Sequence, residues 1–200
     1  MTYAARRAGE TPLPLTIAVD DDGVHYTDAF LDTVMRDIDG ILWQATGPAV
    51  GPPMHGDPLH PGRQRDAMDN LWCTECGQPP GRTDDGMPWA LAAPTPEPTW
   101  EDVDTEVPPI CETCLGRVTA ACPSLRAGHV VLRVRQAPLV GYRGTLHPRP
   151  NQTGRPEADT FVPIAASDDL RRLIATSLVR RLSGCTVITT HHPAGGLPDA

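Results

Sequence analysis

The chain contains no lysine, and all 17 of its basic residues are arginine. A Schiff base with a carbonyl substrate and the phosphate-binding residue of a P-loop both need a lysine amine, so both kinds of site are excluded. Aromatic residues are also scarce, at 4% of 200 residues. The core must therefore be built mainly from Leu, Val, Ile and Ala, and a surface that stacks nucleic-acid bases on aromatic rings is disfavoured.

The sequence has no long apolar run. No stretch approaches the roughly 20 apolar residues that a membrane-spanning helix needs. The first 14 residues are small, polar and charged, unlike the apolar segment of a signal peptide. We therefore expect a cytoplasmic protein that does not insert into membranes. In that reducing compartment, paired cysteines are more often metal ligands than disulfides.

Common catalytic motifs are also missing. The sequence contains no GxSxG, GxGxxG, P-loop or HExxH motif, and it lacks the His-x-Glu pair of the zinc deaminases. These absences disfavour the enzyme classes that depend on those motifs. They leave open an enzyme with a site of another design.

Two CxxC pairs are the strongest signal in the sequence. Each pair can place two thiolates on one tetrahedral zinc ion, and four sulfur ligands leave no position open for water or substrate. The sequence therefore predicts a structural Zn²⁺ ion, and its four ligands are Cys73, Cys76, Cys111 and Cys114. The two remaining cysteines, Cys122 and Cys185, are expected to be small buried hydrophobic residues.

The cysteine pairs resemble those of zinc ribbon and treble-clef proteins, and the resemblance covers about residues 70–126. These families tolerate variable gaps, so the 34 residues between the pairs (77–110) are acceptable. Similar paired-CxxC proteins from actinobacteria and their phages share the pattern, which implies no mechanism. The resemblance implies a treble-clef-like zinc lobe, which we define as residues 70–126, containing a knuckle, a hairpin and a helix in that order.

Treble clefs include the HNH-type nucleases, which need a histidine base on the hairpin and a metal-binding histidine in the helix. Residues 83–91 contain no histidine, and neither do residues 115–127. Without these imidazoles, hydrolysis by that route lacks its base and part of its metal site. The resemblance is therefore compatible at most with an inactive relative of these nucleases.

Hydrophobic periodicity predicts an α+β fold of short antiparallel strands and about four helices, with the treble-clef-like zinc lobe near its middle. The predicted strands are 15–19, 24–26, 41–46, 129–136, 139–146, 160–164 and 185–190. The predicted helices are 27–39, 63–72, 115–122 and 167–182. A hairpin is predicted over 81–91, with Asp85 and Gly86 at its turn.

The same patterns divide the chain into five parts. Residues 1–14 are expected to be a disordered N-terminus, and residues 15–69 an N-terminal α/β part of the core. The zinc lobe occupies residues 70–126. Residues 127–190 supply the C-terminal strands and helix that complete the core, and residues 191–200 form a tail.

Charge is unevenly distributed along the chain. Residues 1–116 hold 6 Arg and 20 acidic residues, whereas residues 117–200 hold 11 Arg and 5 acidic residues. Either the two parts attract each other within the fold, or the arginines form a surface for an acidic partner. Arg133 and Arg135, on a predicted strand, are candidate binding residues for such a partner. The net charge of −8 disfavours nucleic acid, so a protein partner is expected and nucleic acid is the alternative.

A polar loop offers the other candidate site. It brings together two imidazoles, a carboxylate and two guanidiniums, from His55, Asp57, His60, Arg63 and Arg65. Such groups can perform acid–base chemistry or bind an anion, although a solvated loop is the alternative. The predicted function is a non-catalytic, zinc-stapled binding or regulatory protein. The alternatives are an enzyme that uses this loop and a nucleic-acid-binding protein.

Overall fold

The computed structural model describes residues 2–56, 58–93, 95 and 99–192. Over these residues the chain forms five helices and nine strands, which confirms the predicted mixture of α and β structure. Within the described residues, no helix has the length and apolar character required to cross a membrane.

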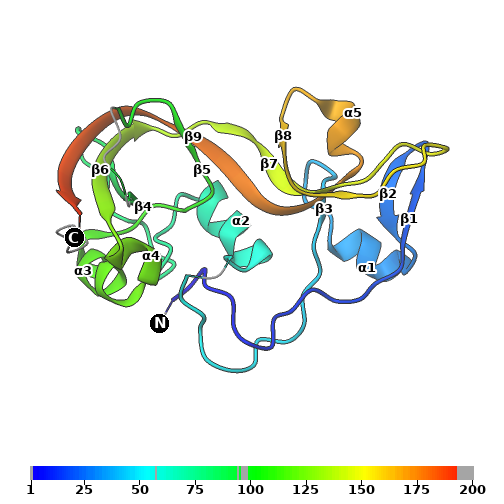
Figure 1. Cartoon of the computed structure of the whole chain (residues 1–200), viewed down its shortest axis with the longest axis horizontal. Coiled ribbons are helices and arrows are strands. Elements are labelled where there is room, and N and C mark those ends of the chain that lie inside the picture. Colours follow the sequence, from blue (N-terminus) through cyan, green and yellow to red (C-terminus); the bar gives the residue numbers. More distant parts are fainter. Residues whose placement is uncertain (1, 57, 94, 96–98, 193–200) are drawn as a thin grey trace, which may run out of the picture.

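A seven-stranded sheet forms the body of the protein. Its strands are β3 (Leu42–Trp43), β4 (Met87–Ala92), β5 (Val103–Thr105), β6 (His129–Gln136), β7 (Leu139–Leu146), β8 (Glu157–Pro163) and β9 (Leu173–His191). Strand β9 is central and sweeps across the molecule (Figure 1). Strands β6 and β7 lie end to end along β9, because Gln136 pairs with Ser183 and Leu139 pairs with Arg180. Strand β4 then pairs with β6, and β8 pairs with β7.

Two short strands pair elsewhere along β9. Strand β3 is parallel to β9 at Ile174 and Ala175, and β5 is antiparallel to it from Arg180 to Leu182. A separate hairpin is formed by β1 (Ile17–Asp20) and β2 (Gly23–Tyr26). These pairings leave a gap along β9 between β3 and β5, and a pocket lies at this gap.

The helices are short and lie around the sheet. They are α1 (Ala29–Val34), α2 (Pro61–Asp69), α3 (Glu112–Ala121), α4 (Pro123–Arg126) and α5 (Ser167–Leu170). Figure 1 shows α1 with the β1–β2 hairpin at one end of the molecule and α3 with α4 at the other, while α2 lies between them next to β9.

The main core lies between the sheet and α2. Its largest fully buried members are Trp43, Met68, Trp89, Leu132, Leu173, Leu178 and Leu182. Complete burial of one such side chain contributes roughly 1.5–3 kcal/mol, so this cluster is the main stabilising feature of the body. Met68 and the partly buried Leu71 of the segment that leads to Cys73 also pack here.

The helix predicted over 167–182 is wrong, because helix α5 ends at Leu170 and the chain then enters β9. From Leu173 to Val179, six of the seven residues are buried. The segment therefore lacks the alternation of buried and exposed residues that marks a strand with one solvent-exposed face. A strand buried on both faces cannot be distinguished from a helix by periodicity alone. At 19 residues, β9 also exceeds the short strands that were predicted.

The hairpin predicted over 81–91 is also wrong. Thr83 and Gly86 form the expected turn, but β4 pairs with β6 across the sheet. Five of the six residues of β4 are buried, and all six pair with residues of β6. In the predicted hairpin, by contrast, the segment before the turn contributes a single bridge, from Thr83. The larger pairing prevails because it buries the apolar residues of both strands.

The remaining helices differ from prediction mainly at their ends. The helix expected over 27–39 is only the six residues of α1, and its N-cap is Asp28. Helix α2 agrees with the prediction for 63–72 within a few residues, and α3 begins three residues before the predicted residue 115. Strands β6 and β7 coincide with the predicted ranges 129–136 and 139–146.

The N-terminal segment, which we expected to be disordered, packs against the body. Ala4 is fully buried, and its backbone bonds to both Thr74 and His60 at 2.9 Å. Glu10 is only 1% exposed and forms an ion pair with Arg63. Residues 2–14, which we call the N-terminal strap, therefore join the residues before α2 to those after it. Of the predicted C-terminal tail, residues 193–200 lie outside the described residues.

Candidate functional site

The four paired cysteines come together at two chain turns. Cys73 and Cys76 lie in a tight turn after α2, where the N–H of Gly77 donates to the carbonyl of Cys73 at 2.9 Å. Gly77 has φ +68°, and a Cβ there would lie 2.7 Å from the ring of Tyr3. Only glycine fits this position without strain.

The second pair lies at the start of α3. Cys111 is the N-cap of this helix, and its side chain makes no capping hydrogen bond. Cys114 follows in the first turn, on the same side of the helix start. This local geometry explains why a CxxC spacing at a helix start delivers two sulfurs to one point.

The four sulfurs have the spacing of a tetrahedral metal site. All four Sγ atoms lie within 4.8 Å of one another, and those of Cys76 and Cys111 are 3.9 Å apart. Four sulfurs at about 2.3 Å from a central zinc ion would be about 3.8 Å apart. None of the cysteines forms a disulfide. The cluster can therefore hold a metal ion through four thiolates.

The surroundings of the sulfurs suit thiolate ligands. The backbone N–H of Cys111 donates to Cys73 Sγ at 3.3 Å, and Arg117 Nη2 donates to Cys114 Sγ at 3.4 Å. Burial raises the pKa of the Cys73 and Cys114 thiols, and a bound cation would oppose that effect by stabilising the thiolates. Four sulfur ligands would fill a tetrahedral coordination sphere and leave no position for substrate.

Two members of the candidate loop support the strap. His60 caps α2, accepting the N–H of Arg63 at Nδ1, while its Nε2 lies 2.9 Å from the hydroxyl of Thr46. Burial and the neighbouring Arg63 lower the pKa of His60, which favours the neutral imidazole that this cap requires. Both terminal nitrogens of Arg63 contact Glu10 at 2.7 Å.

The other loop residues lie apart from this group. The guanidinium of Arg65 is 5.1 Å from the ring centre of Trp43, which is a stacking contact. His55 is exposed, and Asp57 lies outside the described residues. The described loop residues thus form no shared acid–base cluster. The enzyme alternative, which depends on that cluster, finds no support in their placement.

The C-terminal arginines mostly pair with carboxylates of the same chain. Arg133 pairs with Glu112, and Arg135 lies 3.9 Å from Asp85. Similar pairs are Arg171 with Asp168, Arg172 with Asp169, and Arg181 with Asp104. Arg133, Arg135 and Arg181 thus pair with carboxylates of residues 1–116, as the first interpretation of the charge pattern expects, whereas Arg171 and Arg172 pair within residues 117–200.

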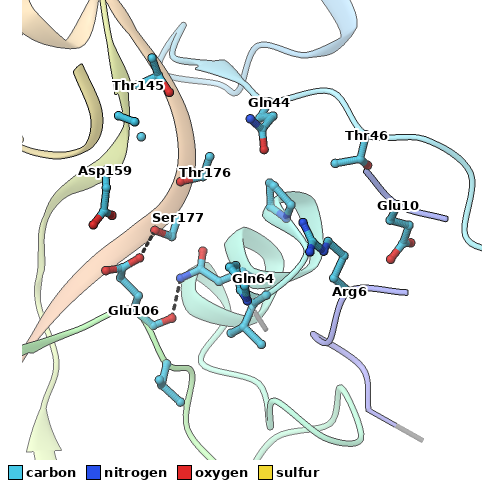
Figure 2. Close-up of a pocket in the computed structure, with 16 residues that line it drawn as sticks. Arg6, Glu10, Gln44, Thr46, Gln64, Glu106, Thr145, Asp159, Thr176 and Ser177 are labelled. Atoms are coloured by element: carbon cyan, nitrogen blue, oxygen red, sulfur yellow. Dashed lines mark hydrogen bonds between the residues drawn. The ribbon is translucent and has the colours of Figure 1, made fainter. Parts of the chain in front are cut away.

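The structure also contains a pocket that the sequence did not reveal. It has a volume of about 520 Å³ and lies between the N-terminal strap, α2, β7 and β9 (Figure 2). Its polar lining includes Arg6, Gln44, Gln64, Glu106, Asp159 and Ser177. These residues come from segments spread over the whole chain, so no local motif could have identified them.

Comparison with protein-family models, with curated proteins and with solved structures finds no match for this chain. Its function must therefore be inferred from its own geometry and chemistry.

Proposed function

We propose that the chain is a non-catalytic binding protein in which Zn²⁺ staples the zinc lobe and a protein partner docks at the opposite end of the molecule. Zinc is the metal proposed because a compact set of four thiolates favours it over harder divalent cations. The knuckle at Cys73 and the helix α3 support a treble-clef-like lobe, although β4 pairs outside it with β6.

The proposed role of zinc follows from the small size of the lobe's own core. The buried residues around the metal site are Cys73, Ala90, Ile110 and Cys114, so two of the four are ligands themselves. A cluster of this size cannot alone order the part of the lobe that carries the cysteines, which lies outside the main core. Metal binding supplies on the order of 10 kcal/mol in small zinc modules, which is enough to fold it.

The observation that supports a protein partner is an apolar surface at α1. Phe30 is 73% exposed, Val34 is 52% exposed and Ile38 is fully exposed. Phe30 and Val34 are four residues apart, so they share one face of the helix. We call the side chains of Phe30 and Val34 the α1 face, whereas Ile38 follows the helix in the turn at residues 38–39. Large apolar side chains gathered on a surface mark sites of protein–protein contact.

Charge around the α1 face defines the chemistry of the partner. Residues 15–40 contain seven aspartates and one arginine, Arg36, which pairs with Asp32. The face therefore lies in a strongly acidic region. A partner with an apolar centre and a basic rim is complementary to it. A second copy of this chain, or a nucleic acid, would bring like charges together and is disfavoured.

The double substitution Phe30→Ser and Val34→Ser is expected to weaken binding of the partner by about 2 kcal/mol or more, because both side chains would be buried at the centre of the contact. The partner would be recovered with tagged full-length protein, identified by mass spectrometry and purified. Calorimetry with the purified partner would then compare wild-type and variant protein.

Val50→Asp is the matched control, since Val50 is 62% exposed but lies outside the α1 face. It should leave binding unchanged, whereas Asp21→Asn with Asp39→Asn should weaken binding mainly at low salt. Equal affinity of wild type and the Phe30/Val34 variant would refute the proposal. Dimerisation of wild type that this variant abolishes would instead assign the face to a second copy of the chain.

A further inference from the structure

The pocket in Figure 2 occupies a break in strand pairing at the edge of β9. Strand β3 ends its pairing at Ala175, and β5 begins at Arg180. Between them, the side chain of Gln64 takes the place of a strand. Its Oε1 accepts the N–H of Leu178 and its Nε2 donates to the carbonyl of Leu178, both at 2.9 Å. Because Gln64 satisfies the backbone N–H and carbonyl of Leu178, β9 needs no strand partner at this point. The space between β3 and β5 remains open as the pocket.

The wall formed by the sheet is held in place by its own contacts. Ser177 donates its hydroxyl to Oε2 of Glu106, while Arg143 Nε lies 2.6 Å from Oε1 of the same carboxylate. The amide of Gln64 also donates to the backbone carbonyl of Glu106 at 2.8 Å. Glu106 is therefore fixed in orientation, and its side chain remains 38% exposed. A site arranged in this way loses little entropy when a ligand binds.

This wall carries excess negative charge. Asp159 joins Glu106 in lining the pocket, and its carboxylate lies 3.5 Å from Arg143 Nη1. One guanidinium thus faces two carboxylates. The side chain of Asp159 is 82% exposed and is available to a ligand. The wall suits a positively charged group such as an ammonium ion.

The opposite side of the pocket is lined by Arg6 and by Glu10, whose carboxylate already pairs with Arg63. Figure 2 shows Arg6 reaching from the N-terminal strap toward the pocket, across from Glu106 and Asp159. A guanidinium has five N–H donors, so Arg6 can bind a carboxylate in addition to its contact within the chain. The amide of Gln44 and the hydroxyl of Thr176 lie between the two charged sides. They can hydrogen-bond to a polar linker such as a peptide group.

We propose that this pocket binds a small zwitterion, an amino acid or a short peptide. Its ammonium group lies at Glu106 and Asp159, and its carboxylate lies at Arg6. Pockets of roughly 300–1,000 Å³ typically hold small organic ligands, and this one is about 520 Å³. Apolar residues such as Leu59 and Val107 also line it and can contact an aliphatic side chain. This site is separate from the α1 face and does not depend on the function proposed for it.

The test is isothermal titration calorimetry of the full-length, metal-containing protein with alanine, dialanine and trialanine, at concentrations up to about 10 mM. At least one of them should bind. Blocking its amine by acetylation, or its carboxylate as an amide, should each weaken binding about tenfold or more, because each removes one charge-assisted contact. The three lengths determine whether the site takes a single amino acid or a peptide.

Variants then assign the two ends of the ligand. Asp159→Asn and Glu106→Gln should weaken the unblocked ligand about tenfold or more, yet affect the acetylated ligand little. Arg6→Gln should weaken binding of ligands with a free carboxylate and affect amidated ligands little. Glu112→Gln, remote from the pocket, should change nothing. Because Asp159 is exposed, its variant tests the site even if Glu106→Gln impairs folding.

Two results would overturn the proposal. One is the absence of binding by all three unblocked ligands over this concentration range. The other is equal binding of blocked and unblocked forms, which would show that the pocket recognises neither charge.

Discussion

Replacing Cys111 with serine is expected to unfold the zinc lobe and to leave the protein insoluble or strongly destabilised. The cysteine-bearing part of the lobe has only a small apolar cluster of its own, so losing one of four thiolates should remove much of the roughly 10 kcal/mol that a metal provides in such modules. Thermal melts of wild-type and variant protein would measure the effect. A chelator should destabilise wild type in the same experiment.

Cys185→Ser is the matched control, because Cys185 is half-buried in β9 and lies outside the metal cluster. Burial and the nearby Glu101 raise its pKa to about 11, so the thiol is neutral and the substitution exchanges one neutral group for another. The cost should be about 1–3 kcal/mol at most. Equal destabilisation by the two substitutions, or no chelator effect on wild type, would show that metal does not hold this lobe together.

Replacing Arg63 with leucine is expected to lower the free energy of unfolding by about 3–5 kcal/mol, since it leaves the carboxylate of Glu10 buried without its partner. Glu10 has 2% of its side chain exposed and binds Arg63 through both oxygens. Urea denaturation at neutral pH would measure the loss. Arg171→Leu, which breaks an exposed pair with Asp168, should cost no more than about 1 kcal/mol.

The same ion pair predicts a pH dependence. The hydrogen bond from Arg63 lowers the pKa of Glu10 from 4.5 to about 2. A carboxyl group with a lower pKa in the folded state stabilises the protein above its unfolded pKa, and this stability is lost as the pH falls through the folded pKa. Stability due to the pair should therefore decline between about pH 4.5 and pH 2. If the Arg63 variant showed the same acid-dependent loss as wild type, the strap would not depend on this pair.

The sequence predicted those features that are encoded locally. The cysteine cluster follows from two CxxC spacings, each of which determines the geometry of one turn. Strand β6 alternates buried apolar residues with Arg133 and Arg135, so its period identifies it directly. Helix α2 follows from the spacing of its apolar residues, although it begins at Pro61, two residues before the predicted start.

Features that depend on distant contacts could not be predicted in this way. The leucines of β9 have spacings that also fit a helix, and only pairing with β6 and β7 makes this segment a strand. The N-terminal strap is polar and rich in small residues, yet Glu10 is held by Arg63, 53 positions later. Gln64, which lines the pocket, bonds to Leu178, which lies 114 positions later. No local sequence pattern carries these contacts.

The metal content of the protein is the most direct test of the central claim that zinc staples the fold. Protein would be purified under reducing conditions without added metal, and its zinc, iron and sulfur would be measured by elemental analysis. X-ray absorption at the zinc edge would give the ligands. We predict one zinc per chain with four sulfur ligands at about 2.3 Å. A zinc content near zero, or a disulfide between Cys73 and Cys76 in the native protein, would contradict this account.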